Sequence, residues 1–521
     1  MPDNHYDIIV IGSGPGGAAL THSLAPTGKR ILLLERGDYL PRAADNWDAR
    51  AVFVDGKYQA KETWYDSKGG TFHPGLHYFV GGNSKVYGAA LLRLRERDFE
   101  EVQHEDGISP AWPLKYETFE PYYSRAEVLF DVHGQSGEDP CEPLRSTGFP
   151  YPAVSHEPKI SKLSDCLLDK GLRPFHLPLG IRLEEKDGRP TPASQCIRCS
   201  AFDGFPCLLN GKADAQIMCV DPVLAAHSNV SLLVNAYVKK LHTDLSGKHV
   251  SSVEVVLNGD LEFFSADIVV VACGALSSAL LLLRSANGLH PDGLANGSGQ
   301  VGRNYMRHNQ SVLMTLMREP NDTIFQKTLA ISDYYFGTAD YDYPLGLVQM
   351  CATTHGPQIK AEAVPPWLQW LPDLPFNTMA RYSMDFWLSS EDIPLAKNRV
   401  SYSDDRVVLD VTETNISAHK RLQKQLKNVL MESGIYPKLF GFGLYLGKKI
   451  PLSGTAHQAG TLRFGTDSAT SVLDVNCKAH ELDNLYVTDA SFFPSIGAVN
   501  PTLTIIANAL RVAEHLQSRL A

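Results

Sequence analysis

The chain has 521 residues, which at about 150 residues per domain allows three or four domains, or fewer large ones. Hydrophobic residues make up 44% and charged residues 20%, which is ordinary for a globular protein and excludes collagen, a coiled coil or a largely disordered chain. The net charge of −10 argues against a nucleic-acid binder, since such proteins need a basic surface to displace counterions from phosphates. A small neutral or cationic substrate fits this charge better.

Nine cysteines are too few for a disulfide scaffold, and the odd number favours a reducing compartment. The N-terminal sequence passes into a strand pattern without a basic or apolar leader, so we expect a cytoplasmic protein, or a periplasmic one if a partner carries it. The longest apolar stretch, 269–283, contains Gly274 and two serines and is shorter than the ~20 residues that span a bilayer.

The first thirty-six residues predict a strand at 8–11, a helix at 16–24 and a second strand at 31–34. Gly12, Gly14 and Gly17 form a GxGxxG motif between the first strand and the helix. Glycines there allow a tight turn and a close approach of the backbone to a pyrophosphate, and the helix amides face the anion. Glu35 ends the second strand, where its carboxylate can bind both ribose hydroxyls of an adenosine. The alternative is a tight turn that binds nothing.

The middle of the chain predicts two kinds of structure. Residues 47–79 show little periodicity and suggest a long irregular excursion, either a lid or an oligomer contact. Residues 231–271 predict an antiparallel meander that leads into a buried strand at 267–272, and Gly274 then begins a helix. In three segments, 313–317, 376–388 and 398–411, apolar or aromatic residues alternate with polar ones, which suits an antiparallel sheet in the substrate domain. Residues 416–432 predict a helix with one apolar stripe.

The C-terminal region holds the candidate reactive groups. His457 lies in a stretch rich in Gly and Thr, and a strand at 485–488 leads to Asp489, whose carboxylate could bind the ribityl chain of a flavin. Asn500 precedes Pro501 and Thr502 at the start of the final helix, whose partial positive charge can stabilise an anionic reduced flavin. A GxGxxG motif at the N-terminus, followed by a long second part of the chain, favours FAD over a diffusible nicotinamide.

Six segments together carry a resemblance to a known family: the fingerprint with Glu35, residues 81–100, 112–127 and 299–308, and the stretches around His457 and Asn500. The chain resembles the glucose-methanol-choline oxidoreductases, most of all the branch with pyranose 2-oxidases and bacterial glycoside 3-oxidases or 3-dehydrogenases. The resemblance implies an α/β Rossmann-like FAD domain joined to an α+β substrate domain with an antiparallel sheet, as in p-hydroxybenzoate hydroxylase. The implied limits are 1–150, 196–310 and 455–521 for the FAD domain, and 151–195 and 311–454 for the substrate domain.

The resemblance also implies the roles of individual residues. His457 and Asn500 form the catalytic pair at the reactive nitrogen of the flavin. His457 could instead be a structural histidine, and Asn500 could only cap the last helix. The implied FAD contacts, for which ordinary turn chemistry is the alternative, are Gly12, Gly14, Gly17, Glu35, Arg36, Gly81, Gly82, Asn83, Ser84, Val238, Asp489, Asn500 and Thr502.

Two positions refine the cofactor prediction. Fungal pyranose 2-oxidases tether their flavin through a histidine where this chain has Val86, so we expect FAD to be bound non-covalently. Tyr87 would lie near the flavin edge or pack in the core. Four cysteines, at 196, 199, 207 and 219, begin as a CxxC pair that suits zinc or an iron–sulfur cluster, but their later spacings match no standard site and we predict no metal.

The predicted reaction is the oxidation of a secondary hydroxyl of a sugar or glycoside to a ketone, with hydride passing to FAD and His457 taking the hydroxyl proton. Aromatic residues at 382–387 and 64–78 could stack on the sugar or belong to the core. Oxygen or another molecule would be the electron acceptor, and a small export or electron-transfer subunit and an oligomer stay open. The alternatives are a choline or other alcohol dehydrogenase, a flavoprotein lyase that does no redox chemistry, and a non-enzymatic FAD-binding subunit.

Overall fold

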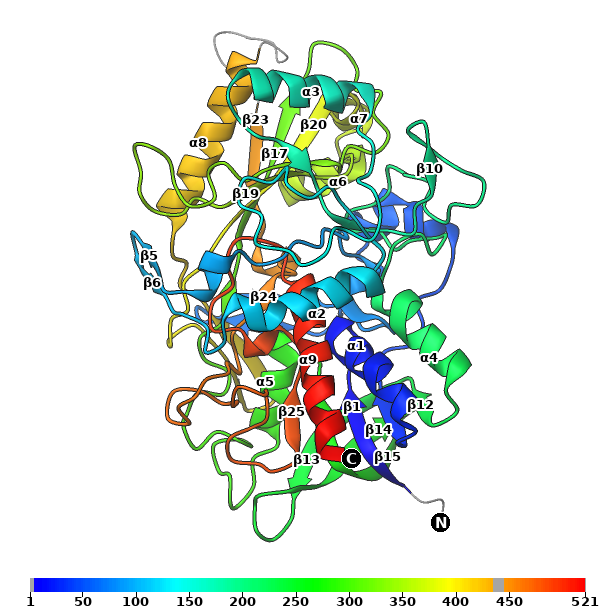
Figure 1. Ribbon diagram of the computed structural model, residues 1–521, viewed down its shortest axis with the longest axis vertical. Helices are drawn as coiled ribbons and strands as arrows, with labels where there is room; N and C mark the ends of the chain where they lie inside the picture. The colour runs from blue at the N-terminus through cyan, green and yellow to red at the C-terminus, as the bar shows by residue number, and fades with distance from the viewer. Residues whose placement is uncertain (1–3, 434–444, 521) are drawn as a thin grey trace.

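A computed structural model describes residues 4–433 and 445–520 of the chain. Two sheets organise it, one in the lower half of Figure 1 and one in the upper half. Residues 434–444 of the predicted substrate domain, and the end residues 1–3 and 521, lie outside the described residues. In the described part, no helix is long and apolar enough to cross a membrane.

The lower sheet is built around the predicted βαβ unit. β1 (His5–Ile11) and β2 (Ile31–Leu34) are parallel, and α1 (Pro15–Leu24) connects them. The second half of β1, Ile8–Ile11, and all of β2 are buried, as is usual for parallel strands. The remaining strands are β12 (Val230–Leu233), β13 (Ala236–Thr243), β14 (Val250–Leu257), β15 (Asp260–Val271) and β25 (Leu485–Val487), in the order β12-β2-β1-β15-β14-β13 with β25 beside β15.

β15 belongs to both parts of this sheet. Its first half pairs antiparallel with β14 in the predicted meander, and its second half pairs parallel with β1 and β25. β25, from the C-terminal part of the chain, is therefore separated from β1 by β15 alone. The final helix, α9 (Thr502–Leu520), packs on α1 and on α2 (Tyr116–Leu129). α5 (Ala275–Arg284) begins after Gly274, as predicted, and contacts β13.

The upper sheet is antiparallel and has the order β23-β17-β20-β19-β18-β8. Helices α3 and α8 pack on one of its faces, where Leu163, Phe386 and Leu422 belong to a single apolar cluster. The predicted helix at 416–432 is confirmed, with its apolar stripe facing the sheet. The elements are β8 (Phe175–His176), β17 (Asn309–Leu316), β18 (Leu329–Ile331), β19 (Leu347–Met350), β20 (Ser383–Ser390), β23 (Tyr445–Lys449), α3 (Pro158–Asp169) and α8 (Ile416–Glu432).

Two segment predictions need correction. Residues 374–382 form a helix, α7 (Leu374–Tyr382), and only the second half of the expected strand is in the sheet, as β20. Pro375 in its first turn suits a helix start, which the aromatic alternation concealed. The hairpin of β21 (Arg399–Ser403) and β22 (Arg406–Asp410) joins β3 (Trp64–Asp66) and β4 (Thr71–Phe72) of the 47–79 excursion in a separate four-stranded sheet.

The other elements are short. They are α4 (Asp221–Ala226), α6 (Gly356–Ala363), β5 (Val102–His104), β6 (Gly107–Ser109), β7 (Val132–His133), β9 (Leu179–Gly180), β10 (Glu185–Lys186), β11 (Arg189–Pro190), β16 (Met306–Arg307) and β24 (Gln458–Ala459). β16 and β24 pair with each other, so the segments that carry residues 306–307 and 458–459 are adjacent. This pairing brings the start of β17 next to His457.

Candidate active site

The glycine turn after β1 leaves room for a ligand at one position only. A Cβ on Gly12 would lie 2.4 Å from the Ala272 carbonyl oxygen, and a Cβ on Gly17 would lie 2.0 Å from the Gly12 carbonyl oxygen. These two glycines are needed for backbone packing. A Cβ on Gly14 would meet no atom within 4 Å, although Gly14 caps the N-terminus of α1. The open side of Gly14 fits the pyrophosphate of a dinucleotide, held by the helix amides.

Glu35 and Ser13 connect this turn to the loop at 81–84. The Glu35 carboxylate is 6% exposed and accepts hydrogen bonds from the Ser13 amide (3.1 Å), the Ser13 hydroxyl (2.6 Å) and the Gly37 amide (2.9 Å). Burial raises the pKa of Glu35 in spite of these donors. The Gly81 amide donates to the Ser13 hydroxyl (3.1 Å), so the two glycine-rich loops are in contact.

The other predicted FAD contacts lie around these loops or at the start of α9. Arg36 stacks between Tyr78 and Tyr237 and pairs with Glu62 at 3.2 Å. A Cβ on Gly82 would lie 3.2 Å from the Gly14 Cα. The Asn83 side chain accepts a hydrogen bond from the His77 amide, and the Ser84 hydroxyl donates one to the Gly81 carbonyl. Val238 is buried on β13, and Thr502 is the first residue of α9.

Asp489 is already bonded within the protein. It follows β25, and its Oδ2 accepts from the Gly274 amide (3.0 Å) and the Ser278 hydroxyl. Its Oδ1 accepts from the amide and hydroxyl of Ser491 at 2.9 and 2.6 Å. The carboxylate therefore joins the start of α5 to the segment after β25, and a contact with the ribityl chain remains a prediction.

His457 and Asn500 each contact a glutamine of the antiparallel sheet. Nε2 of Gln310 on β17 lies 2.7 Å from Nδ1 of His457, and Gln349 on β19 donates through Nε2 to Oδ1 of Asn500 at 3.1 Å. Gln310 is paired with Ser389 and Gln349 with Trp387 on the intervening strand β20. Residues paired directly across antiparallel strands point to the same face, so both glutamines lie on one face of the sheet. The helices α3 and α8 cover the opposite face.

The environment of His457 keeps its imidazole neutral. Burial lowers the pKa of His457 well below its ordinary value, and the positive charge of His308, when protonated, and of Lys327 lowers it further. Lys327 forms an ion pair with Asp203 at 2.9 Å. A neutral imidazole beside a carboxamide can accept a proton from a hydroxyl group that is oriented by the amide.

His308, Gln310 and Gln349 have no role in the sequence-based prediction. His308 is in the segment 299–308 that carried the resemblance, but a single histidine before a strand gives no chemical signal. The glutamines belong to ordinary β-strand patterns, and only the register of β17, β19 and β20 brings them together.

The cysteine cluster at 196–219 is better explained by packing. All nine cysteines are free thiols. Burial raises the pKa of Cys196 to about 12 and that of Cys219 further, so both are uncharged at neutral pH. Cys199 donates to the Ala201 carbonyl, and Cys207 accepts from the Gly211 amide. Within residues 4–433 and 445–520, no group of three or more His, Cys, Asp or Glu side chains could hold a metal ion.

Comparison with known sequences identifies the family. Residues 74–310 match the N-terminal part, and residues 397–509 the C-terminal part, of the GMC oxidoreductases. The chain belongs to the GMC oxidoreductase family. The 6'''-hydroxyparomomycin C oxidase of Streptomyces lividus is 31% identical over 100% of this chain and 92% of its own length. A pyranose 2-oxidase of Tricholoma matsutake is 40% identical, but only over 17% of this chain and 14% of its own.

The fold agrees with this assignment. Pyridoxine 4-oxidase from Mesorbium loti superposes with a TM-score of 0.65 at 20% identity, covering 98% of this chain and 99% of its own. The predictions of the family, of the two-part fold, and of an FAD-dependent enzyme that acts on CH–OH donors are confirmed. The similarity to pyranose 2-oxidase is limited to one segment, whereas the similarity to the aminoglycoside oxidase extends along the whole chain.

Proposed function

We propose that this GMC oxidoreductase oxidises a hydroxyl group of a sugar or glycoside, with His457 as the base and Asn500 as the group that orients the reacting oxygen. The observation that supports this proposal is the arrangement of Gln310 and Gln349. From one sheet face they contact His457 and Asn500, which come from chain segments more than forty residues apart. Amide and imidazole groups gathered at one sheet face are suited to a substrate with many hydroxyls.

His457 and Asn500 can act on the same substrate oxygen in different ways. Oδ1 of Asn500 accepts from Gln349, so the Asn500 amide NH₂ is left to donate to the substrate oxygen. The neutral His457 ring takes the hydroxyl proton, and its lowered pKa keeps it in the basic form even in mildly acidic solution. Bound FAD supplies the hydride acceptor.

We propose that FAD is bound without a covalent link and that its pyrophosphate lies at Gly14. Val86 carries no group that could attach to a flavin, and the Tyr87 hydroxyl is engaged with the Ala213 carbonyl. The residues proposed to surround FAD come from both ends of the chain, in agreement with the proposed domain limits of 1–150, 196–310 and 455–521.

Trp387 is the proposed stacking residue for the sugar ring. It is partly exposed on β20, opposite Gln349, and therefore on the same sheet face as both glutamines. Trp64, in contrast, is 2% exposed and packs on Phe72, which makes it a core residue. We expect Trp387→Ala to raise KM for a sugar about tenfold or more, with a smaller change in kcat, because a ring–ring contact is lost. An unchanged KM would remove Trp387 from the binding site.

The test of the function is anaerobic mixing of the yellow protein with free sugars, glycosides, aminoglycosides, choline and simple alcohols, while flavin absorbance is followed. Bleaching by a carbohydrate supports the proposal, and bleaching by choline or simple alcohols alone rejects it. A ketone product indicates the secondary hydroxyl that we expect. An aldehyde would indicate a primary hydroxyl, a second candidate favoured by the full-length similarity to an aminoglycoside oxidase.

His457→Ala tests the base. We expect flavin bleaching to slow by about 10²–10⁴-fold, because proton removal loses its acceptor, while the protein retains its FAD. The ratio of flavin to protein absorbance checks retention, and stopped-flow absorbance measures the rate. Bleaching at the wild-type rate would exclude His457 as the base. Oxygen or another molecule is the proposed electron acceptor, and following the flavin absorbance under air distinguishes the two.

A further inference from the structure

A second histidine contacts the proposed base through its ring. His308 immediately precedes β17 and is 1% exposed. Its Nδ1 lies 2.9 Å from Nδ1 of His457, and the two rings are nearly perpendicular, at 84° with centroids 5.0 Å apart. A buried imidazole at hydrogen-bonding distance from a catalytic imidazole determines which nitrogen of its partner carries the proton.

The Nδ1–Nδ1 contact can hold only one hydrogen, so one ring donates and the other accepts. The other nitrogen of His308, Nε2, is buried without a hydrogen bond of normal length among the described residues. The backbone carbonyls of Ile496 and Gly497 nevertheless favour a proton on the His308 ring. Carbonyl oxygens only accept, and Nδ1 of His308 faces the His457 ring, so Nε2 is the nitrogen of His308 left to carry that proton and Nδ1 is left as the acceptor.

We propose that His308 accepts the Nδ1–H of His457 and so fixes the tautomer in which Nε2 of His457 carries the free lone pair. His308 is then a positioning residue, and this inference rests on the proposed function. Nε2 of Gln310 lies 2.7 Å from the same Nδ1 of His457. The two orientations of a carboxamide fill the same space, so Gln310 can turn its oxygen towards the Nδ1–H and support the same tautomer.

The charged groups around the two rings are compatible with this assignment. Burial lowers the pKa of His308 to about 4, although Glu391 opposes this shift, so His308 is neutral at pH 7. Glu391 is itself bonded to His104, to the Ser109 hydroxyl and to the Gly497 amide. Lys327 faces His457 and disfavours its protonation. At neutral pH the pair therefore contains two uncharged rings and a single shared hydrogen.

Two substitutions of His308 test the proposal by stopped-flow reduction of the FAD-bound enzyme with its carbohydrate. We expect His308→Leu to slow bleaching by about 10²–10³-fold, because His457 loses the acceptor that selects its reactive tautomer. His308→Asn should retain the rate within about tenfold, since its side-chain oxygen can take the place of Nδ1.

His419→Leu is the matched control. His419 is also buried, and burial lowers its pKa to about 4, but it hydrogen-bonds to the hydroxyls of Ser311 and Ser390 on the sheet face opposite Gln310. A loss of rate in His419→Leu equal to that in His308→Leu would overturn the proposal. Wild-type rates in His308→Leu, or failure of His308→Asn to restore the rate, would also overturn it.

A second readout does not depend on activity. In a long-range ¹⁵N–¹H correlation spectrum of histidine-labelled protein, the His457 signals are identified by comparison with His457→Gln. We expect a protonated Nδ1 and an unprotonated Nε2, and the opposite assignment would overturn the proposal even if no substrate had been found. If the spectrum shows the expected tautomer, and His308→Leu but not His419→Leu changes it, the role of His308 stands even when no carbohydrate bleaches the flavin and the proposed function fails.

Discussion

At the scale of single residues, burial decides the charge of an ionisable group, Asp98, near the segment that leads to Asn500. Asp98 is 6% exposed and accepts hydrogen bonds from the Arg95 amide and the Tyr335 hydroxyl, each at 2.8 Å. Tyr335 in turn accepts from the Ala498 amide, two residues before Asn500. Burial, aided by the charge of Glu391, raises the pKa of Asp98 to about 7. This carboxyl therefore changes charge near neutral pH.

The sign of its effect on stability follows from proton linkage. The ordinary pKa of an aspartate is 3.8, so between pH 3.8 and about pH 7 the Asp98 carboxyl is protonated to a greater extent in the folded protein than in the unfolded chain. Its contribution to stability is complete below pH 3.8 and is lost as the pH rises through 7. We expect Asp98→Asn, which carries no charge, to gain stability relative to the wild type between pH 5 and 9, on the order of 3 kcal/mol at ~1.4 kcal/mol per pKa unit.

Urea unfolding at pH 5, 7 and 9 measures this difference. Asp165→Asn, at an exposed position of α3, is the control and should show no such trend. A difference between Asp98→Asn and the wild type that stays constant across this range would show that Asp98 does not titrate there.

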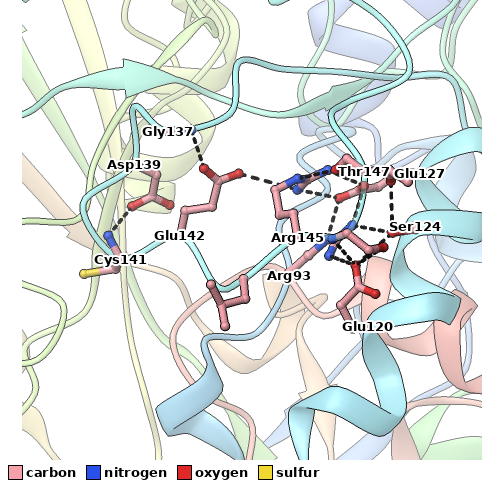
Figure 2. A network of polar contacts seen from close by, with 12 residues as sticks. Arg93, Glu120, Ser124, Glu127, Gly137, Asp139, Cys141, Glu142, Arg145 and Thr147 are labelled. Atoms are coloured by element: carbon pink, nitrogen blue, oxygen red, sulfur yellow. Dashed lines mark hydrogen bonds and ion pairs between the residues drawn. The ribbon is translucent and has the colours of Figure 1, made fainter.

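At the scale of elements, buried ion pairs join α2 to the loop at 137–147 (Figure 2). Glu127 on α2 is 1% exposed and accepts from Nε and Nη2 of Arg93 at 2.9 and 2.8 Å. Arg145 from the loop also donates two hydrogen bonds to Glu127. Glu120 supplies a second carboxylate to Arg93 at 3.1 Å, and Glu142 supplies one to Arg145 at 3.5 Å, so two guanidinium groups face three carboxylates.

We expect Glu127→Gln to lower the free energy of unfolding by about 3–5 kcal/mol, because it removes the buried carboxylate that binds both Arg93 and Arg145. Arg125 and Glu514 form an exposed pair between α2 and α9, with 48% and 57% of the side chains accessible. Removing that pair with Glu514→Gln should cost less than about 1 kcal/mol. Equal losses in the two variants, measured by urea unfolding, would show that the network does not fix the loop.

The elements that the sequence predicted correctly are those with a local cause. The βαβ unit combines apolar runs with a glycine motif, and 416–432 repeats its apolar residues at helical spacing, so both could be assigned without tertiary information. The prediction of a strand over the whole of 376–388 was wrong, because the alternation of aromatic and polar residues concealed the helix start at Pro375. The 399–410 hairpin was placed in the wrong sheet because strand partners are set by packing and not by pattern.

At the scale of the whole molecule, the candidate site exists only because distant segments meet. His457 and Asn500 could be predicted from the sequence, since family motifs surround them. Gln310 and Gln349 could not, because their positions depend on the register of three strands. The site lies where the antiparallel sheet faces the C-terminal segments beside the parallel sheet (Figure 1). A bound dinucleotide at Gly14 would further connect the N-terminal turn to this region.

Gly14→Ala tests this arrangement. Gly14 has φ −65° and ψ −178°, which alanine adopts without strain, and its Cβ would meet no protein atom within 4 Å. We therefore expect the FAD-free protein to keep its thermal midpoint, while FAD binding weakens at least tenfold because the methyl group occupies the space of the pyrophosphate. Gly148→Ala is the matched control, since a Cβ there also meets nothing within 4 Å, but far along the chain from the glycine turn. Calorimetry with FAD added to both apoproteins measures the difference, and equal affinities would mean that the dinucleotide does not lie against α1.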